Sequence, residues 1–238
     1  MRRFNSARSN GQVRLPLIAR ELVTSDAVTG DAMIKGMLIG LMAACFATAV
    51  PALAQAMTPP DALARSVTDE VLAVLRADRD IQSGNQKKVM DLVEKKVLPH
   101  FNFVRMTQLA VGRHWREASP EQQKLLVGEF RTLLVQTYAA TFTAYRDQAI
   151  EYRPLRLQPD ETDVVVRSLI NQPGGKPVTV DYKMQKSGDG WKVYDVVVGD
   201  LSLVQSYRGS FNSEVQKGGI DGLVKALTEK NKQLASRQ

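Results

Sequence analysis

The first half of the chain beyond residue 57 shows apolar side chains at helical spacing. Residues 58–78 place four of them three or four positions apart: Leu63, Val67, Val71 and Val74. Residues 86–98 repeat the pattern, and Pro99 follows. A single apolar stripe at this period indicates an amphipathic helix, and proline cannot continue one. We therefore predict helices over 58–78 and 86–98.

Helix-start signals predict two further helices. Asn102 can cap a short helix that ends at Gly112. Residues 119–122 read Ser-Pro-Glu-Gln, which combines a capping box with a proline at the first helical position. This second signal predicts a long helix that runs to about Arg146.

The period changes to two after Asp147. In residues 178–185, Val178, Val180, Tyr182 and Met184 alternate with polar residues, as in a half-buried antiparallel strand. Similar segments and glycine-rich hairpin loops predict four strands: 149–158, 162–170, 178–185 and 191–198. Helical patterns return over 201–217 and 220–235, with a break at Gly218 and Gly219. The order predicts an α+β fold, with a four-stranded curved antiparallel meander between N-terminal and C-terminal helices.

The N-terminal segment has the organisation of a secretory leader. Residues 33–54 contain a lysine, an apolar stretch from Met37 to Val50 and the triplet Ala52-Leu53-Ala54. This is typical of a signal peptide, and the stretch is shorter than the roughly 20 residues of a spanning helix. We expect cleavage after residue 54, with 1–32 as an extension and 55–238 as a single domain. Cys45 leaves a lipoprotein processing site as an alternative.

The net charge and the cysteine content argue against several classes of function. The full chain has a formal net charge of +7. Removing the leader takes away six basic and three acidic residues, which leaves 26 Lys and Arg against 22 Asp and Glu, or +4. This charge is too small to indicate nucleic-acid binding. Cys45 is the single cysteine, so the mature domain has no disulfide, thiolate metal site or cysteine nucleophile.

No sequence motif predicts a metal centre or a catalytic site. His100 and His114 lie fourteen residues apart, which matches no common metal-ligand spacing. We expect no metal and no cofactor, and a structural hydrogen bond for each histidine. Asp195 interrupts an apolar strand and leaves an enzymatic alternative open. Isomerases of the nuclear-transport-factor-like superfamily, whose outline is similar, use a carboxylate in an apolar pocket as a base.

Several separated segments together resemble the MlaC family. They are VLPHFNFVRMTQLAVGRHWREASPEQQ (97–123), EFRTLLVQTYAATFTAY (129–145), VTVDYKM (178–184), GWKVYDVVVGDLSLVQSYRGSF (190–211) and GGIDGLVKAL (218–227). MlaC proteins are periplasmic phospholipid-binding proteins of the Mla (maintenance of lipid asymmetry) pathway, also called the toluene-tolerance family. The resemblance covers about residues 58–234. It departs from the family pattern at Gly199-Asp200, where Glu-Gly is usual.

The resemblance implies a non-enzymatic periplasmic carrier of phospholipid. The expected partners are an outer-membrane lipoprotein–porin complex and an inner-membrane ABC transporter, contacted transiently by a monomer. The acyl chains would occupy an apolar cavity between the sheet and the long helix. The expected lining comprises Met106, Leu109, Phe130, Leu133, Leu134, Tyr138, Val164, Val166, Val178, Val180, Tyr182, Val196, Val198, Leu203 and Tyr207. An interaction module with a solidly packed interior remains the third possibility.

Overall fold

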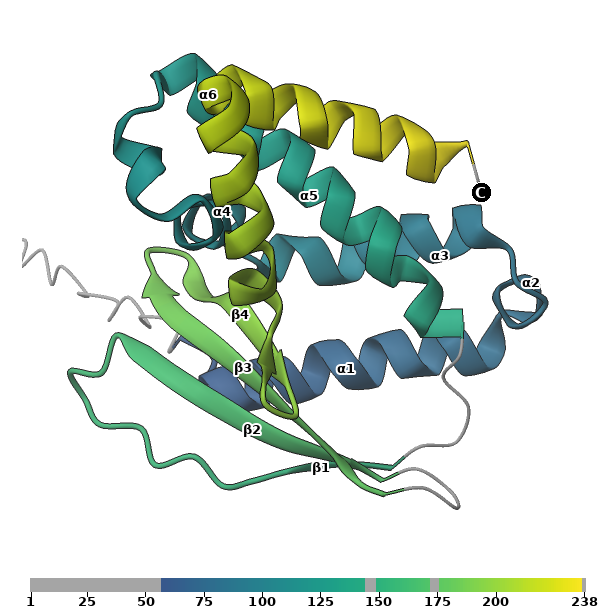
Figure 1. Cartoon of the computed structure of the whole chain (residues 1–238). Coiled ribbons are helices and arrows are strands. Elements are labelled where there is room, and N and C mark those ends of the chain that lie inside the picture. The colour runs from purple at the N-terminus through teal and green to yellow at the C-terminus, as the bar shows by residue number, and fades with distance from the viewer. Residues whose placement is uncertain (1–56, 144–148, 172–175, 237–238) are drawn as a thin grey trace, which may run out of the picture. The chain divides into compact units, whose positions relative to one another are not determined.

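The computed structural model describes residues 57–143, 149–171 and 176–236. The predicted leader, its cleavage site and Cys45 lie outside the described residues. The described part belongs to one compact unit. In Figure 1 α5 lies above the strands, α1 overlaps them near β3, and α6 rises from the short strand that follows β4.

The N-terminal helices follow the predicted pattern, with one difference. Helix α1 spans Pro60–Ala77, the single turn α2 spans Arg79–Gln82 and α3 spans Gln86–Leu92. The second predicted helix continues beyond α3 as a π-helical turn over Val93–Val97 and a 3-10 turn over Leu98–His100. Pro99 therefore lies within a short turn, where the α-helical hydrogen-bonding pattern has already ended.

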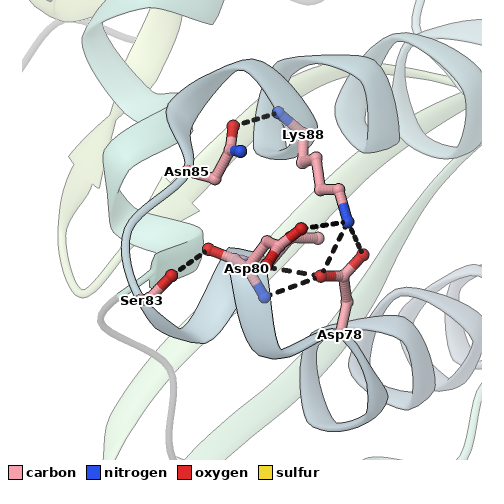
Figure 2. A network of polar contacts seen from close by, with 6 residues as sticks. Asp78, Asp80, Ser83, Asn85 and Lys88 are labelled. Atoms are coloured by element: carbon pink, nitrogen blue, oxygen red, sulfur yellow. Dashed lines mark hydrogen bonds and ion pairs between the residues drawn. The ribbon is translucent and has the colours of Figure 1, made fainter.

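A polar network closes the turn between α1 and α3 (Figure 2). Asp78 caps α2, since its Oδ1 accepts from the amides of Asp80 and Ile81 at 2.9 and 3.2 Å. Lys88 of α3 reaches back with its Nζ 2.9 Å from Asp78 Oδ2 and 2.7 Å from Asp80 Oδ2. The hydrogen bond from Lys88 and those from the two amides hold the pKa of the Asp78 carboxyl below its usual value.

Both predicted caps in the middle of the chain are confirmed. Helix α4 spans Phe103–Val111, and Asn102 Oδ1 accepts from the Arg105 amide at 2.9 Å. A 3-10 turn over Gly112–Arg116 follows. Helix α5 spans Pro120–Thr143. At its start the Ser119 amide donates to Gln122 Oε1 and the Gln122 amide donates to Ser119 Oγ, the reciprocal pair of a capping box. The predicted continuation to Arg146 lies outside the described residues.

Within the described residues the sheet has five strands in chain order, all antiparallel, instead of the predicted four. Their bounds are β1 Ala149–Tyr152, β2 Asp163–Asn171, β3 Val178–Ser187, β4 Gly190–Val198 and β5 Leu201–Ser202. The first strand ends earlier than predicted because Pro154 has no amide hydrogen for the ladder. The extra strand β5 is two residues long, and its Ser202 also caps the next helix, so no alternation could reveal it.

Helix α6 spans Leu203–Ala235 and contains the predicted break. Gly218 and Gly219 have non-helical backbone angles, and Gly219 has a positive φ of 66°. Glycine adopts this conformation without the steric penalty that a Cβ would impose. The chain therefore changes direction there, and the second segment of α6 runs alongside α5 (Figure 1).

The buried apolar residues form three clusters. The largest joins α4, α5 and α6 around Phe130 and Leu126. A second joins α1, α3 and α5. The third, which we call the sheet cluster, consists of Val164, Val166, Met184, Trp191 and Val193. Partly buried residues pack against it: Leu63 and Ala64 of α1, Phe101, Tyr152, Leu155, Tyr182 and Val196. Among the described side chains of α5, the buried ones belong to the two helical clusters.

The network around Asp78 predicts a pH-dependent contribution to stability. Because its folded-state pKa is lowered, the ionised carboxylate stabilises the fold fully above its unfolded pKa, and this contribution is lost as pH falls through the folded-state value. Asn retains the capping oxygen and removes the charge. We expect Asp78→Asn to lower the urea midpoint at pH 7, with a difference from wild type that shrinks in acid. A difference independent of pH would contradict the ionic contribution.

Candidate functional site

The register of the central strands defines the face of the sheet that turns toward the interior. Val166 of β2 pairs with Tyr182 of β3, and Tyr182 pairs with Val196 of β4. Directly paired residues project to the same face, so all three share the face of the sheet cluster. We call this the inner face.

The inner face carries mostly apolar residues, with Ser168 of β2 among them, and only some of these residues are buried in the sheet cluster. Val164, Val166, Met184, Trp191 and Val193 are buried in the sheet cluster. The remaining apolar residues, which we call the apolar strip, are Ile170, Val178, Val180, Tyr182, Val196 and Val198. Of these, Val180 is buried, Val198 is 48% exposed and the other four are half-buried. The helical layer therefore leaves much of the apolar strip accessible.

Tyr182 lies where the apolar strip meets the sheet cluster. Burial raises the pKa of its phenol well above the usual range, and the neighbouring Tyr152 raises it further. The side chain nevertheless keeps an intermediate accessibility.

Polar groups from the sheet and α1 meet at one edge of the apolar strip. The phenol of Tyr182 hydrogen-bonds with Tyr152 and Ser168. Tyr152 Oη lies 2.6 Å from Thr68 Oγ1 and donates to the Ala64 carbonyl at 3.2 Å. We call Thr68, Tyr152, Ser168 and Tyr182 the polar seam. The Arg65 guanidinium lies at its outer end, 4.7 Å from the centre of the Tyr152 ring.

Sequence reasoning missed most of the polar seam. Tyr182 was predicted as lining, but Thr68, Tyr152 and Ser168 were not singled out. The available signals were weak: Thr68 is a hydroxyl on the apolar stripe of α1, and Ser168 is a polar residue on the buried face of β2. Neither signal identifies the residue with which the hydroxyl of Thr68 or Ser168 forms a hydrogen bond.

The fifteen predicted lining residues fall into separate groups. Val164 and Val166 are in the sheet cluster, and four strand residues with Tyr182 form much of the apolar strip. Seven helical residues belong to the cluster of α4, α5 and α6 or pack at its edge: Met106, Leu109, Phe130, Leu133, Leu134, Leu203 and Tyr207. Tyr138 is 38% exposed, and its hydroxyl is a hydrogen-bond partner of Tyr207.

The helical group is tightly packed around Phe130. The rings of Tyr207 and Phe211 both meet the Phe130 ring edge-on, with centroids 5.1 Å away. Phe130 itself has no exposed surface. The long helix thus turns its buried Phe130 toward α6, so the structure divides the residues that the sequence predicted as one lining.

The two histidines have different surroundings. His114 is only 8% exposed, with Nδ1 2.8 Å from Glu117 Oε2 and Nε2 3.1 Å from Asn212 Oδ1. It therefore joins the turn after α4 to α6 through more than the one hydrogen bond that was expected. His100 is half-buried, and burial lowers its pKa. In the described part of the chain, no group of three or more His, Cys, Asp or Glu residues could hold a metal ion.

Asp195 has a full set of structural partners on the face opposite the apolar strip. It alternates with Val196 on β4 and pairs with Lys183, whose Nζ donates to Asp195 Oδ2 at 3.0 Å. Ser202 Oγ also donates to Oδ2, at 2.7 Å, and the Val204 amide donates to Oδ1 at 3.2 Å. These contacts attach the start of α6 to the sheet and account for the burial of the carboxylate.

Comparison with known proteins places this geometry in a family. Residues 65–229 match the sequence model of the family described as MlaC protein. The chain belongs to the MlaC family. The predicted resemblance is confirmed, and with it the α+β class.

Relatives of the MlaC family cover most of the described chain. The intermembrane phospholipid transport system binding protein MlaC of Haemophilus influenzae is 25% identical over 73% of this chain and 83% of its own length. Toluene tolerance protein ttg2D of Pseudomonas putida is 24% identical over 79% and 84%. A solved structure of the phospholipid-binding protein of Ralstonia solanacearum, in complex with a phospholipid, is 44% identical over 74% of this chain and 98% of that chain, with a TM-score of 0.68.

No helix among the residues that the structure describes has the length and hydrophobicity needed to span a membrane. Helix α1 instead has a one-sided apolar stripe that packs on the sheet and on α3. Such a stripe is typical of a helix on the surface of a folded domain.

The contacts of Asp195 predict a structural role that can be measured. Asp195→Ala would leave the Lys183 ammonium and the Val204 amide without their partner, and a charged hydrogen bond of this kind contributes about 2 to 3 kcal/mol. We expect a loss of that order in the free energy of unfolding, measured by urea denaturation. Asp200→Ala, in the exposed turn before β5, is the control and should change stability little. An equal loss of stability in the two variants would show that the contacts of Asp195 do not stabilise the fold.

Proposed function

We propose that this MlaC family member is a non-enzymatic periplasmic carrier that shuttles phospholipid between an outer-membrane lipoprotein–porin complex and an inner-membrane ABC transporter. The observation that carries the proposal is the partly uncovered apolar strip on the inner face of the sheet. The Ralstonia solanacearum relative, in complex with a phospholipid, supports the same cargo. The leader pattern in residues 33–54 supports a periplasmic location.

The hydrophobic effect explains why such a carrier is needed. Each buried CH₂ group is worth about 0.8 kcal/mol, so a single acyl chain of roughly sixteen carbons costs on the order of 12 kcal/mol to hold in water. A carrier lowers this barrier by giving the chain an interior about as apolar as a bilayer. Loading and release are then nearly balanced, and differences in affinity between the partner complexes set the direction.

We assign the acyl chains to the apolar strip and the polar end of the lipid to the polar seam. The strip offers aliphatic side chains with accessible surface, as an acyl chain requires. The seam offers the hydroxyls of Tyr182 and Tyr152 at one edge, where ester oxygens could accept hydrogen bonds. Arg65 at the outer end lacks an ion-pair partner among the described residues and can meet a phosphate. The helical lining residues predicted from the sequence remain part of the proposal.

The direct test is to measure the phospholipid that co-purifies with the protein. We expect phospholipid in solvent extracts of protein purified without detergent, identified by mass spectrometry at a stoichiometry near one lipid or more per chain. Circular dichroism of the same sample establishes that it is folded. Folded protein without phospholipid would overturn the proposal.

Two neighbouring valines test the assignment of the acyl chains to the strip. Val196 and Val197 are both half-buried but lie on opposite faces of β4. We expect Val196→Trp to fill space beside Tyr182 and to reduce co-purified lipid severalfold, while Val197→Trp leaves it near the wild-type level. Equal lipid content in the two folded variants would show that the acyl chains lie elsewhere.

A further inference from the structure

A second candidate binding site lies between α4 and α6, away from the inner face of the sheet. A groove of about 520 Å³ is lined there by Val111, Arg113 and His114 on one side and by α6 on the other. Its polar lining consists of Arg113, His114, Gln205, Arg208 and Asn212. The lining contains two guanidinium groups, two amides and no carboxylate.

Arg208 is held in the groove by the shape of the turn opposite it. Gly112 has a φ of 66°, and a Cβ built on it would lie 3.3 Å from both Nε and Nη2 of Arg208. The absence of a side chain at Gly112 therefore lets the guanidinium lie against the backbone. Gly112 therefore ends α4 and also leaves room for the guanidinium of Arg208.

The other wall of the groove is built on a buried polar pair. His114, which is only 8% exposed, contacts Asn212 of α6 at 3.1 Å, and the Arg113 Nε lies 3.5 Å from His114 Nε2. The carboxylate of Glu117, three residues after His114, lies with its Oε2 2.8 Å from His114 Nδ1. Among the described residues neither Arg113 nor Arg208 forms an ion pair with a carboxylate, although ten other Lys and Arg residues and His114 do.

We propose that this groove is an anion site that binds a phosphate group through Arg113 and Arg208. Two planar guanidinium groups present paired N–H donors that match the tetrahedral oxygens of phosphate. Gln205 and Asn212 add amide donors on the α6 side. The phosphate can belong to a phospholipid headgroup at a membrane surface or to a free phosphate ion. The site rests on its own residues and not on the proposed cargo.

Titration with inorganic phosphate tests the site. We expect ¹⁵N-labelled protein, in a buffer without phosphate or sulfate, to show saturable shifts of the Arg113 and Arg208 Nε–H signals and of the Gly112 amide. Arg208→Gln should weaken phosphate binding about tenfold, the effect of one charge-assisted hydrogen bond. Arg208→Lys retains the charge but loses the fork and should weaken it too. Thermal unfolding of each variant shows whether the fold is retained.

Arg116→Gln is the matched control. Arg116 lies in the same turn as Arg113, is exposed and does not line the groove. Arg116→Gln removes the same charge as Arg208→Gln, but from outside the groove. The phosphate affinity of this variant should therefore stay within about twofold of wild type. An equal loss in Arg116→Gln and Arg208→Gln would show a diffuse charge effect and overturn the site. No saturable shift in the millimolar range of phosphate would also overturn it.

Vesicle flotation distinguishes the two sources of phosphate. Binding to phosphatidylglycerol vesicles that falls in Arg208→Gln but not in Arg116→Gln would assign the groove to a lipid headgroup. Equal flotation of the two variants, together with weaker binding of inorganic phosphate by Arg208→Gln, would assign it to free phosphate. Both results support the site. Neither measurement depends on the lipid content of the purified protein. The anion site and the proposed carrier function can therefore be overturned separately.

Discussion

The arrangement depends on polar contacts that attach the helices to the sheet at three places, in addition to the packing of α1 on the sheet cluster. At the first, the Asn102 amide donates to the Val193 carbonyl at 2.8 Å, just before α4 begins. At the second, Asp195 holds the first turn of α6 through the Val204 amide. At the third, Tyr152 of β1 donates to a carbonyl of α1. Each contact has a fixed geometry, so the distance between helices and strands is set at these places.

This design has an energetic consequence for the apolar strip. A fold that closed its helices onto Val196 and Tyr182 would gain about 25 cal/mol for each Å² of apolar surface removed from water. The buried side chains of α5 instead pack against other helices: Phe130 packs against α6, and Val135 packs against α1 and α3. The free energy that the empty protein forgoes at the strip is available to a bound apolar molecule, which would in turn stabilise the folded state.

The sequence predicted the parts of the fold that depend on neighbours in the chain. The caps at Asn102 and Ser119 and the break at Gly218 and Gly219 involve residues within one turn, so residue type and spacing suffice. The strand β5 escaped prediction because Ser202 serves both the ladder and the start of α6. Periodicity also identifies a buried face but not the distance to the layer above it. It therefore grouped Phe130 with Val196, although they lie in different parts of the interior.

Side chains that meet across long sequence separations were the hardest to predict. Thr68 and Tyr152 are 84 residues apart, and His114 and Asn212 are 98 apart. Each is an ordinary residue within its own segment, and its role arises only where the fold brings the partner near. The same reason explains Asp195: an isolated carboxylate in a strand suggests a base, whereas Ser202 and Val204 become its partners only after the turn at Gly199 reverses the chain.

Helix α6 connects the two surfaces of the molecule that carry proposals. Its first turn is attached to the sheet by Asp195, and its next turns are held by Tyr207 and Phe211 against Phe130. Arg208 lies between these two aromatic residues in the chain, so the backbone that carries it is already ordered. Binding an anion there does not require a segment to fold, which removes one of the main entropic costs of association. The packing of the apolar interior therefore also prepares the charged groove on the outside.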